Sequence, residues 1–140
     1  MDEHPSVPKP VPNPDGLNAD FYAHCAKGTL CFQRCKSCGT WRHLPRDMCA
    51  KCGSPEWEWS PSSGLGRIYS WTVTHRALHP AFAGDVPYAV VIVELEEGVR
   101  MVSGLRGLPP EKLELDLPVE VELERVSDEV AIPYVRPRRS

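Results

Sequence analysis

The sequence predicts a mainly β protein in which an N-terminal helix and a cysteine-rich ribbon precede a small closed β-barrel. Two observations lead to this fold class. Residues 35–53 hold two closely spaced CxxC pairs, and residues 67–135 hold five short segments rich in β-branched and aromatic residues. We therefore divide the 140 residues into a proline-rich leader or linker at 1–16, the helix and ribbon at 17–63, the barrel at 64–136 and a tail at 137–140.

The ribbon prediction depends on the segments Cys35-Lys36-Ser37-Cys38-Gly39 and Cys49-Ala50-Lys51-Cys52-Gly53. Four thiolates satisfy the tetrahedral preference of a structural zinc ion, and glycine permits the positive φ that such turns often need. We therefore expect zinc as a structural cofactor, with Cys35, Cys38, Cys49 and Cys52 as its ligands. Two disulfides are the weaker alternative because nothing marks the chain as secreted, and no βαβ pattern supports a thioredoxin-type redox pair.

Charge and hydropathy narrow the function classes. The formal net charge is −3 with neutral thiols, and four thiolates on one zinc ion would make it about −5. Such an acidic balance is a poor match to a general nucleic-acid binder, which usually carries a basic surface. The sequence has neither a secretory leader nor an apolar run near the roughly 18 residues of a membrane span. We therefore expect a cytoplasmic protein without a membrane segment.

The N-terminal part combines a proline-rich leader with one helix. Five prolines between residues 5 and 14 favour an extended polyproline II conformation, as a disordered arm or as an interdomain linker. The helix is expected from Asn18 to Lys27, and its apolar residues recur at helical spacing: Leu17, Phe21, Tyr22 and Cys25. A helix this short must dock its apolar side, either on the same chain or on a partner protein. Phe21 and Tyr22 are the candidates for a partner contact, since aromatic residues often anchor interfaces.

The barrel prediction rests on five expected strands that follow a connector rich in Ser, Pro and Gly at 54–66. These strands are residues 67–76, 88–95, 99–105, 119–126 and 130–135. The almost continuously apolar strand 88–95 should be central and buried, whereas Pro133 should place the last strand at an edge. Short strands joined by turns and one long loop, residues 77–87, fit a small barrel of the OB type.

The candidate catalytic residues form no recognisable acid–base or nucleophile signature. They are His43, His75, His79, Cys25 and Cys31. The roles of Cys25 and Cys31 stay open, with Cys31 as a minor alternative zinc ligand. We therefore expect no catalysis by this chain alone. His79 and Phe82 in the long loop, together with Tyr88, are the candidates to border a partner's substrate channel, because function gathers in loops.

The order of these motifs resembles the family called domain of unknown function 35, the OB-fold acyl-CoA-associated zinc-ribbon proteins. The resemblance covers nearly all of the chain from Leu17 onward. It is carried by Phe21-Tyr22, Gln33-Arg34-Cys35, Cys38-Gly39, Pro45-Arg46, Cys49, Cys52-Gly53, Gly64-Leu65-Gly66, Ser70-Trp71-Thr72, Pro87-Tyr88, Leu95 and Gly98. The sequence departs from the family pattern at Leu115-Asp116-Leu117-Pro118, which lacks the usual glycine, and it carries an extra Cys31. The first departure puts only the geometry of a turn in doubt.

This resemblance implies a rubredoxin-like ribbon and a non-catalytic accessory subunit that works in a hetero-oligomer. Such proteins support thiolase-like enzymes or hotdog-fold hydratases that handle acyl-CoA, so the catalytic residues would lie on the partner. More narrowly, the sequence is similar to the tail domains of actinobacterial enoyl-CoA hydratases of steroid side-chain degradation. Those tail domains partner a thiolase-like retro-aldolase, which implies a role in lipid metabolism.

A single-stranded nucleic-acid-binding module is the alternative function, because zinc ribbons and OB barrels both serve that role. Its signature would be stacking residues beside a basic groove. Tyr69, Trp71 and Tyr88 could stack on bases. The glutamates that alternate along residues 119–126 oppose a polyanion, however, and make this alternative the weaker one.

Overall fold

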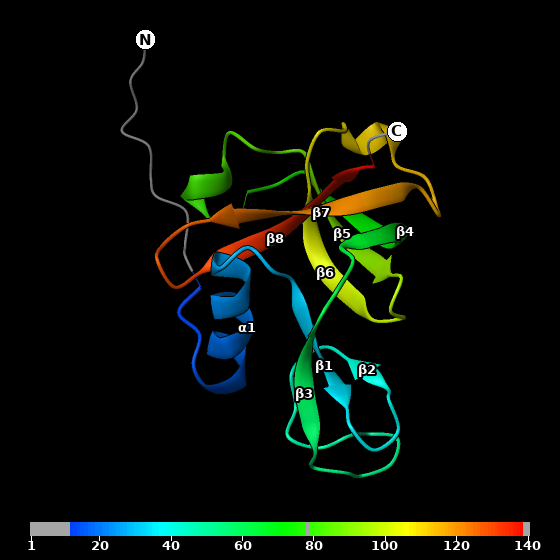
Figure 1. Ribbon diagram of the computed structural model, residues 1–140. Coiled ribbons are helices and arrows are strands. Elements are labelled where there is room, and N and C mark those ends of the chain that lie inside the picture. Colours follow the sequence, from blue (N-terminus) through cyan, green and yellow to red (C-terminus); the bar gives the residue numbers. More distant parts are fainter. Residues whose placement is uncertain (1–11, 78, 139–140) are drawn as a thin grey trace.

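The computed structural model describes residues 12–77 and 79–138 and confirms a mainly β fold (Figure 1). A three-stranded ribbon in the order β2-β1-β3 is joined to a closed barrel in the order β4-β5-β6-β8-β7. The described elements are α1 (Gly16–Ala26), β1 (Cys31–Cys35), β2 (Trp41–Arg42), β3 (Trp57–Pro61), β4 (Leu65–Thr74), η1 (Pro80–Phe82), β5 (Tyr88–Leu95), β6 (Arg100–Leu105), η2 (Pro110–Lys112), β7 (Pro118–Arg125) and β8 (Ala131–Pro137).

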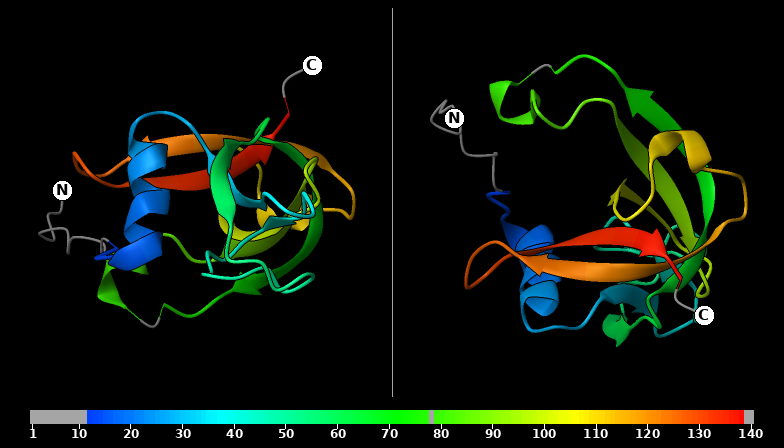
Figure 2. Two further views of the ribbon diagram at one scale, coloured as in Figure 1. Left: turned by 60° about the horizontal axis from the view of Figure 1, so that its bottom comes forward. Right: turned by 90° about the horizontal axis from the view of Figure 1, so that it is seen from above.

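The helix docks its apolar side on the same chain. It ends before Gly28, whose φ of +92° is a left-handed conformation that glycine adopts without penalty. Phe21 and Cys25 are buried, and α1 contacts β1, β7 and β8, as Figure 2 shows from two sides. The helix therefore belongs to the core that joins the ribbon to the barrel. None of the helices in the described ranges has the length and apolar character of a membrane-crossing segment.

The barrel interior is filled by side chains that alternate along the strands. The innermost are Ile68, Val91, Val93, Val119 and Val135, all fully buried. The structure corrects one expectation, because β5 is buried on one face only and its outward residues Val90 and Ile92 are half-buried. A continuous apolar run thus reflects a strand whose outer face is partly covered, rather than one enclosed on both sides.

The prediction that Pro133 places the last strand at an edge is wrong. β8 lies between β7 and β6, pairing antiparallel with β7 and parallel with β6. The parallel ladder is short and begins at Gly104 and Tyr134, one residue beyond Pro133. Val135 accepts a hydrogen bond from Arg106 on the β6 side, so the missing N–H of Pro133, two residues earlier, faces the same side before the ladder starts. The Ser103 hydroxyl, at 2.9 Å, satisfies the Pro133 carbonyl there.

The predicted connector contains a strand. β3 pairs with β1 over five residue pairs, so Trp57 and Trp59 belong to the ribbon sheet. Trp57 and Trp59 favour a strand here because aromatic residues have a high β propensity. Their rings meet edge to face with centroids 5.3 Å apart. The Ser, Pro and Gly residues around them confine the strand to a short length.

The junction between ribbon and barrel is held by the turn that follows β5. Glu97 accepts hydrogen bonds from the Ser62 hydroxyl at 2.6 Å and from the Ser63 amide at 2.9 Å. The next contact is tighter still, because the backbone of Gly66 lies against β5. A Cβ atom placed on Gly66 would lie 2.5 Å from the Glu94 carbonyl oxygen. Glycine at this position is therefore a packing requirement, independent of its φ.

The turn that lacks the family's glycine keeps a left-handed residue. Asp116 adopts a φ of +65°, a conformation that aspartate tolerates better than most residues. Its carboxylate pairs with Arg67, Nη1 to Oδ1 at 3.0 Å. Aspartate thus replaces glycine in the turn and adds an ion pair to β4.

His43 packs within the joint between helix and ribbon. Its ring centroid lies 4.9 Å from that of Phe21 and 5.1 Å from that of Phe32. Removal from water disfavours the charged imidazolium and lowers the pKa of His43 to about 4. The imidazole is therefore a neutral member of an aromatic cluster.

Replacing Gly66 with Ala should destabilise the fold by about 2 kcal/mol, because the added methyl collides with backbone that cannot move independently. Gly84→Ala is the matched control, since nothing lies within 4 Å of a Cβ at that position. Urea unfolding of both variants measures the difference. Equal stability of the two variants would contradict the close packing of β4 on β5.

The low pKa of His43 should appear in the pH dependence of folding. The unfolded histidine takes up its proton near pH 6.5, whereas the folded one does so only near pH 4, so stability is lost as the pH falls through this window. We expect this residue to cost about 2 kcal/mol at pH 5 relative to pH 8. Urea unfolding of the wild type and of His43→Phe at both pH values isolates the contribution. An identical pH dependence in the two proteins would rule it out.

Candidate functional site

The two CxxCG segments form the same turn. In each, the glycine N–H donates to the carbonyl of the first cysteine, at 2.9 Å for Gly39 and 2.8 Å for Gly53. Both glycines have positive φ, +77° and +76°. The N–H of the first cysteine donates in turn to the residue after the glycine, Thr40 or Ser54, at 2.9 Å. Two identical turns thus present four sulfur atoms to one point.

The four sulfur atoms have the spacing of a zinc site. The Sγ atoms of Cys35, Cys38, Cys49 and Cys52 all lie within 4.8 Å of one another. The Cys35–Cys52 and Cys38–Cys49 separations are 3.6 and 3.7 Å, close to the roughly 3.8 Å edge of a tetrahedron with Zn–S bonds of about 2.3 Å. Cys31 lies outside this group, in the core. Four thiolates would close the coordination sphere and leave no position for a water or a substrate.

Hydrogen bonds favour the thiolate form at Cys35 and Cys38, whereas the neighbouring Cys35 sulfur raises the pKa of Cys52 to about 11. The Thr40 hydroxyl and backbone N–H lower the pKa of the Cys38 thiol to about 6, with Sγ 3.1 Å from Thr40 Oγ1. The Lys51 N–H points at Cys49 Sγ from 3.4 Å. Arg34 donates from Nε to the Gly39 carbonyl at 3.2 Å and places a positive charge beside the first turn. These contacts offset part of the net −2 charge that four thiolates give a bound zinc ion.

Gln33 braces the segment that joins the two turns. Its side chain is buried, and its carbonyl oxygen accepts from Arg42 Nε at 2.8 Å and from the Arg46 N–H at 2.7 Å. The Arg42 guanidinium also reaches the Arg46 carbonyl at 2.8 Å. This bracing leaves the apolar side chains of Leu44 and Met48 exposed, at 63% and 55%.

The remaining two cysteines are core residues. Cys25 and Cys31 are both buried. Burial, together with the neighbouring Cys31 thiol, raises the pKa of Cys25 to about 12, and burial also raises the pKa of Cys31. Neither thiol is therefore poised as a nucleophile at neutral pH.

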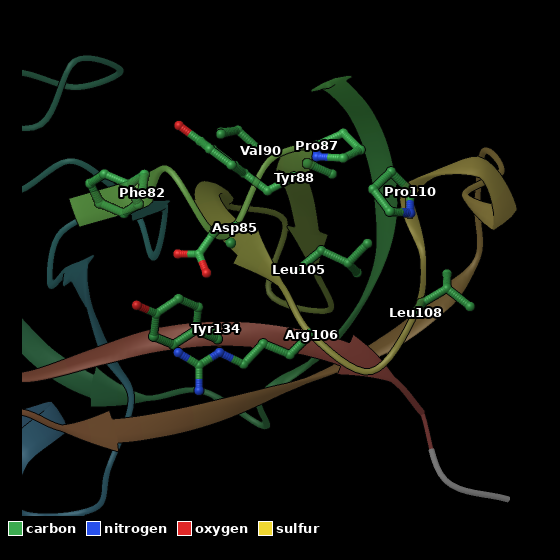
Figure 3. Close-up of a pocket in the computed structure, with 12 residues that line it drawn as sticks. Phe82, Asp85, Pro87, Tyr88, Val90, Leu105, Arg106, Leu108, Pro110 and Tyr134 are labelled. Atoms are coloured by element: carbon green, nitrogen blue, oxygen red, sulfur yellow. The ribbon is translucent and has the colours of Figure 1, made fainter. Parts of the chain in front are cut away.

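A pocket of about 510 Å³ lies where the long loop meets β5, β6 and β8 (Figure 3). Phe82 and Tyr88, two of the residues selected from the sequence, line it with ring centroids 6.0 Å apart. The His79 ring lies edge to face against the ring of Phe82, with the centroids 6.0 Å apart. Its Nδ1 accepts a hydrogen bond from the Ala81 N–H at 3.0 Å and so caps the start of η1.

Sequence reasoning missed the opposite wall of the pocket. Tyr134 lies over Gly104, where a Cβ atom would come within 2.8 Å of the tyrosine ring. The Arg106 guanidinium stacks on the same ring at 3.7 Å and is ion-paired with Glu124. These residues come from strands that are distant in sequence, so no local pattern could have brought them together.

The aromatic pair of the helix has two different environments. Phe21 is 5% exposed and lies in the core. Tyr22 is half-buried, and both rings line a surface groove together with His43 and Leu44. Of the two, Tyr22 is the more exposed.

Replacing Cys38 or Cys52 with Ser should remove zinc and destabilise the ribbon, because metal binding in such small sites contributes directly to folding. We expect the zinc content to fall from one ion per chain to well below one, with a lower midpoint of thermal unfolding. Cys31→Ser is the matched control, since this buried cysteine lies outside the sulfur cluster. Full zinc content in both test variants would overturn the ligand set.

The family models match the two structural parts in order. Residues 23–58 match the model described as "ChsH2, rubredoxin-like zinc ribbon domain", and residues 59–124 match "ChsH2, C-terminal OB-fold domain". With four cysteines brought together in such a ribbon, zinc is the structural cofactor of this chain.

Individual relatives agree with these models. A solved structure titled "Ltp2-ChsH2(DUF35) aldolase" superposes with a TM-score of 0.79 at 39% identity, covering 92% of this chain and 98% of the other. A "Probable enoyl-CoA hydratase alpha subunit" from Thermomonospora curvata is 39% identical over 93% of this chain, which spans 40% of that protein. A "DUF35 domain-containing scaffold protein" from Methanocaldococcus jannaschii is 35% identical over 69% of this chain and 68% of its own length. The chain is therefore a member of the DUF35 family of zinc-ribbon and OB-fold proteins.

Proposed function

We propose that this chain is a non-catalytic accessory subunit that binds and supports a thiolase-like enzyme acting on CoA thioesters. The observation that carries the proposal is the superposition, over nearly the whole of both chains, on the structure titled "Ltp2-ChsH2(DUF35) aldolase". The finer proposal is that the partner is the retro-aldolase of steroid side-chain degradation. The hydratase subunit of Thermomonospora curvata supports a hotdog-fold hydratase as a further partner and acyl-CoA as the shared substrate class.

The geometry of the described residues supports a role without chemistry of its own. Four sulfur donors close the metal site, so the zinc ion has no position at which to activate water. His43 is held neutral inside the aromatic cluster, and His79 Nδ1 is used by the backbone of its own loop. We therefore assign the catalytic residues to the partner.

The surface that best suits a partner lies beside the helix and the ribbon. Tyr22 lines a groove of about 300 Å³ together with His43 and Leu44. Leu44 and Met48 add two large apolar side chains that are more than half exposed. Exposed apolar residues around an aromatic side chain are typical of interaction sites.

Co-purification with the thiolase-like protein encoded nearest to this chain tests the proposal. We expect a stable complex, and retro-aldol or thiolytic activity on a CoA thioester only when both chains are present. Separate elution, with an enzyme that is fully active alone, would refute the accessory role. The nucleic-acid module would then be the function to examine, by salt-sensitive binding to single-stranded oligonucleotides.

Leu44→Asp should weaken the complex by about tenfold or more, because it places a charge in an apolar contact. Val102→Asp is the matched control, since Val102 is equally exposed, at 67%, but lies on β6 of the barrel. Analytical ultracentrifugation or titration calorimetry compares the two dissociation constants. A stronger effect from Val102→Asp would move the interface from the ribbon to the barrel.

A further inference from the structure

We infer that the groove between the zinc ribbon and the turn after β5 is the docking site for an acidic segment of the partner protein. The groove has a volume of about 400 Å³, and we call it the ribbon groove. The inference rests on the accessory role and deepens it, because it states the chemistry by which this chain recognises the partner.

The lining of the ribbon groove carries charge of one sign. One side comes from the ribbon, between residues 40 and 51, and the other from residues 98–100, where the barrel turns from β5 into β6. None of the lining residues is acidic, and four are positively charged: Arg42, Arg46, Lys51 and Arg100. A recess lined by one sign of charge attracts a ligand of the opposite sign.

Three of these positive charges have no carboxylate partner among the described residues: Arg42, Arg46 and Lys51. The Arg42 guanidinium donates only to uncharged acceptors, the Gln33 side-chain oxygen and the Arg46 carbonyl. Its Nη1 atom is buried without a hydrogen-bond partner. A guanidinium that is partly removed from water gains most from a carboxylate that pairs with it.

Arg100 differs from the other three, because it is already engaged. Its Nε atom lies 3.4 Å from Glu94 Oε2, and its guanidinium stacks on the ring of Tyr69 at 3.8 Å. The positive charge available to a ligand therefore comes from the ribbon side of the groove.

The zinc centre does not cancel this charge. Residues 31–53 hold five basic side chains against the single carboxylate of Asp47. Four thiolates on one zinc ion contribute a net −2, which leaves the ribbon with a charge of about +2. The chain as a whole is acidic, so its positive charge is concentrated in the ribbon.

Apolar side chains beside the groove favour a polypeptide over a small anion. Leu44 is exposed and lines both the ribbon groove and the neighbouring groove at Tyr22. Met48, also exposed, lies in the sequence between Arg46 and Lys51. A polypeptide segment can present carboxylates to the basic residues and apolar side chains to Leu44 and Met48, whereas a small anion would use the charges alone.

The acidic strand of a second copy of this chain is a poorer occupant. Acidic residues are densest along β7, but Glu122 pairs with Arg136 and Glu124 pairs with Arg106 within the same barrel. These carboxylates are already compensated, so docking them in the groove would first break ion pairs. We therefore assign the acidic segment to the partner.

Charge reversal in the groove tests the inference on the full chain and the thiolase-like protein encoded nearest to it. Arg46→Glu should lower the association rate constant by about tenfold at roughly 50 mM NaCl, because opposite charges act mainly on association. Lys112→Glu is the matched control, since it makes the same change in net charge at an exposed residue of η2 outside the groove. It should change the rate by less than about twofold. Biolayer interferometry measures both rates.

The salt dependence of the complex provides a second readout. Raising NaCl to roughly 500 mM should weaken the wild-type complex by about tenfold and the Arg46→Glu complex by less, because salt screens the attraction that the variant has already lost. Lys51→Glu supplies a second charge reversal in case Arg46→Glu fails to fold. The zinc content and circular dichroism of each variant confirm that folded ribbons are compared.

The outcomes separate this inference from the accessory role. A complex that forms equally fast with the wild type and both groove variants, or that is insensitive to salt, overturns only the inference. Absence of a complex at either salt concentration refutes the accessory role and the inference with it.

Two further outcomes would assign the groove to another occupant and overturn the inference. One is self-association of the isolated chain in analytical ultracentrifugation that Arg46→Glu abolishes, which would indicate a second copy. The other is calorimetric binding of inorganic pyrophosphate that Arg46→Glu abolishes while the complex is unchanged, which would indicate a small anion.

Discussion

The convergence of four cysteine sulfurs on one point is the constraint on which the rest of the structure depends. The ribbon strands are short, and β2 has only two residues, so hydrogen bonds and apolar burial alone give it little stability. The metal site fixes both turns, and β1, which ends in the first of them, then becomes the central strand of the ribbon. Through Phe32 of β1 the same strand reaches the aromatic cluster that holds Phe21 and His43. The zinc site, the helix and the barrel are in this way parts of one packed unit.

Local patterns in the sequence predicted most of the fold. The spacing of the cysteines led directly to the ribbon, and the extents of β5 and β6 followed from β-branched runs separated by a glycine turn. Prediction failed where long-range pairing decided the outcome. The sequence predicts Pro133 at an edge because it cannot show that the missing N–H falls outside a short parallel ladder. The pocket wall formed by Gly104, Arg106 and Tyr134 is not predictable from the sequence for the same reason, since β6 and β8 meet only after the barrel closes.

Prediction of the candidate site residues also depends on whether local sequence or long-range packing determines their position. Phe82 and Tyr88 line the pocket because a long loop and the strand that follows it must be close in space. Phe21 and Tyr22 are adjacent in sequence, yet one is in the core and the other at the surface, as helical geometry dictates for neighbouring residues. Leu44 and Met48 were not identified, because exposure of an apolar residue depends on how Gln33 braces the segment between the two turns.

The strand pairings that close the barrel differ in length. β7 and β8 pair along seven residues, whereas β6 and β8 share only two paired positions, reinforced by the Ser103 hydroxyl. This seam is the place where the barrel can open at the lowest cost in hydrogen bonds, so local breathing concentrates there. Gly104 and Tyr134, the two residues that begin the short ladder, also form the floor and wall of the aromatic pocket. The short seam that completes the barrel is therefore also part of the lining of this pocket.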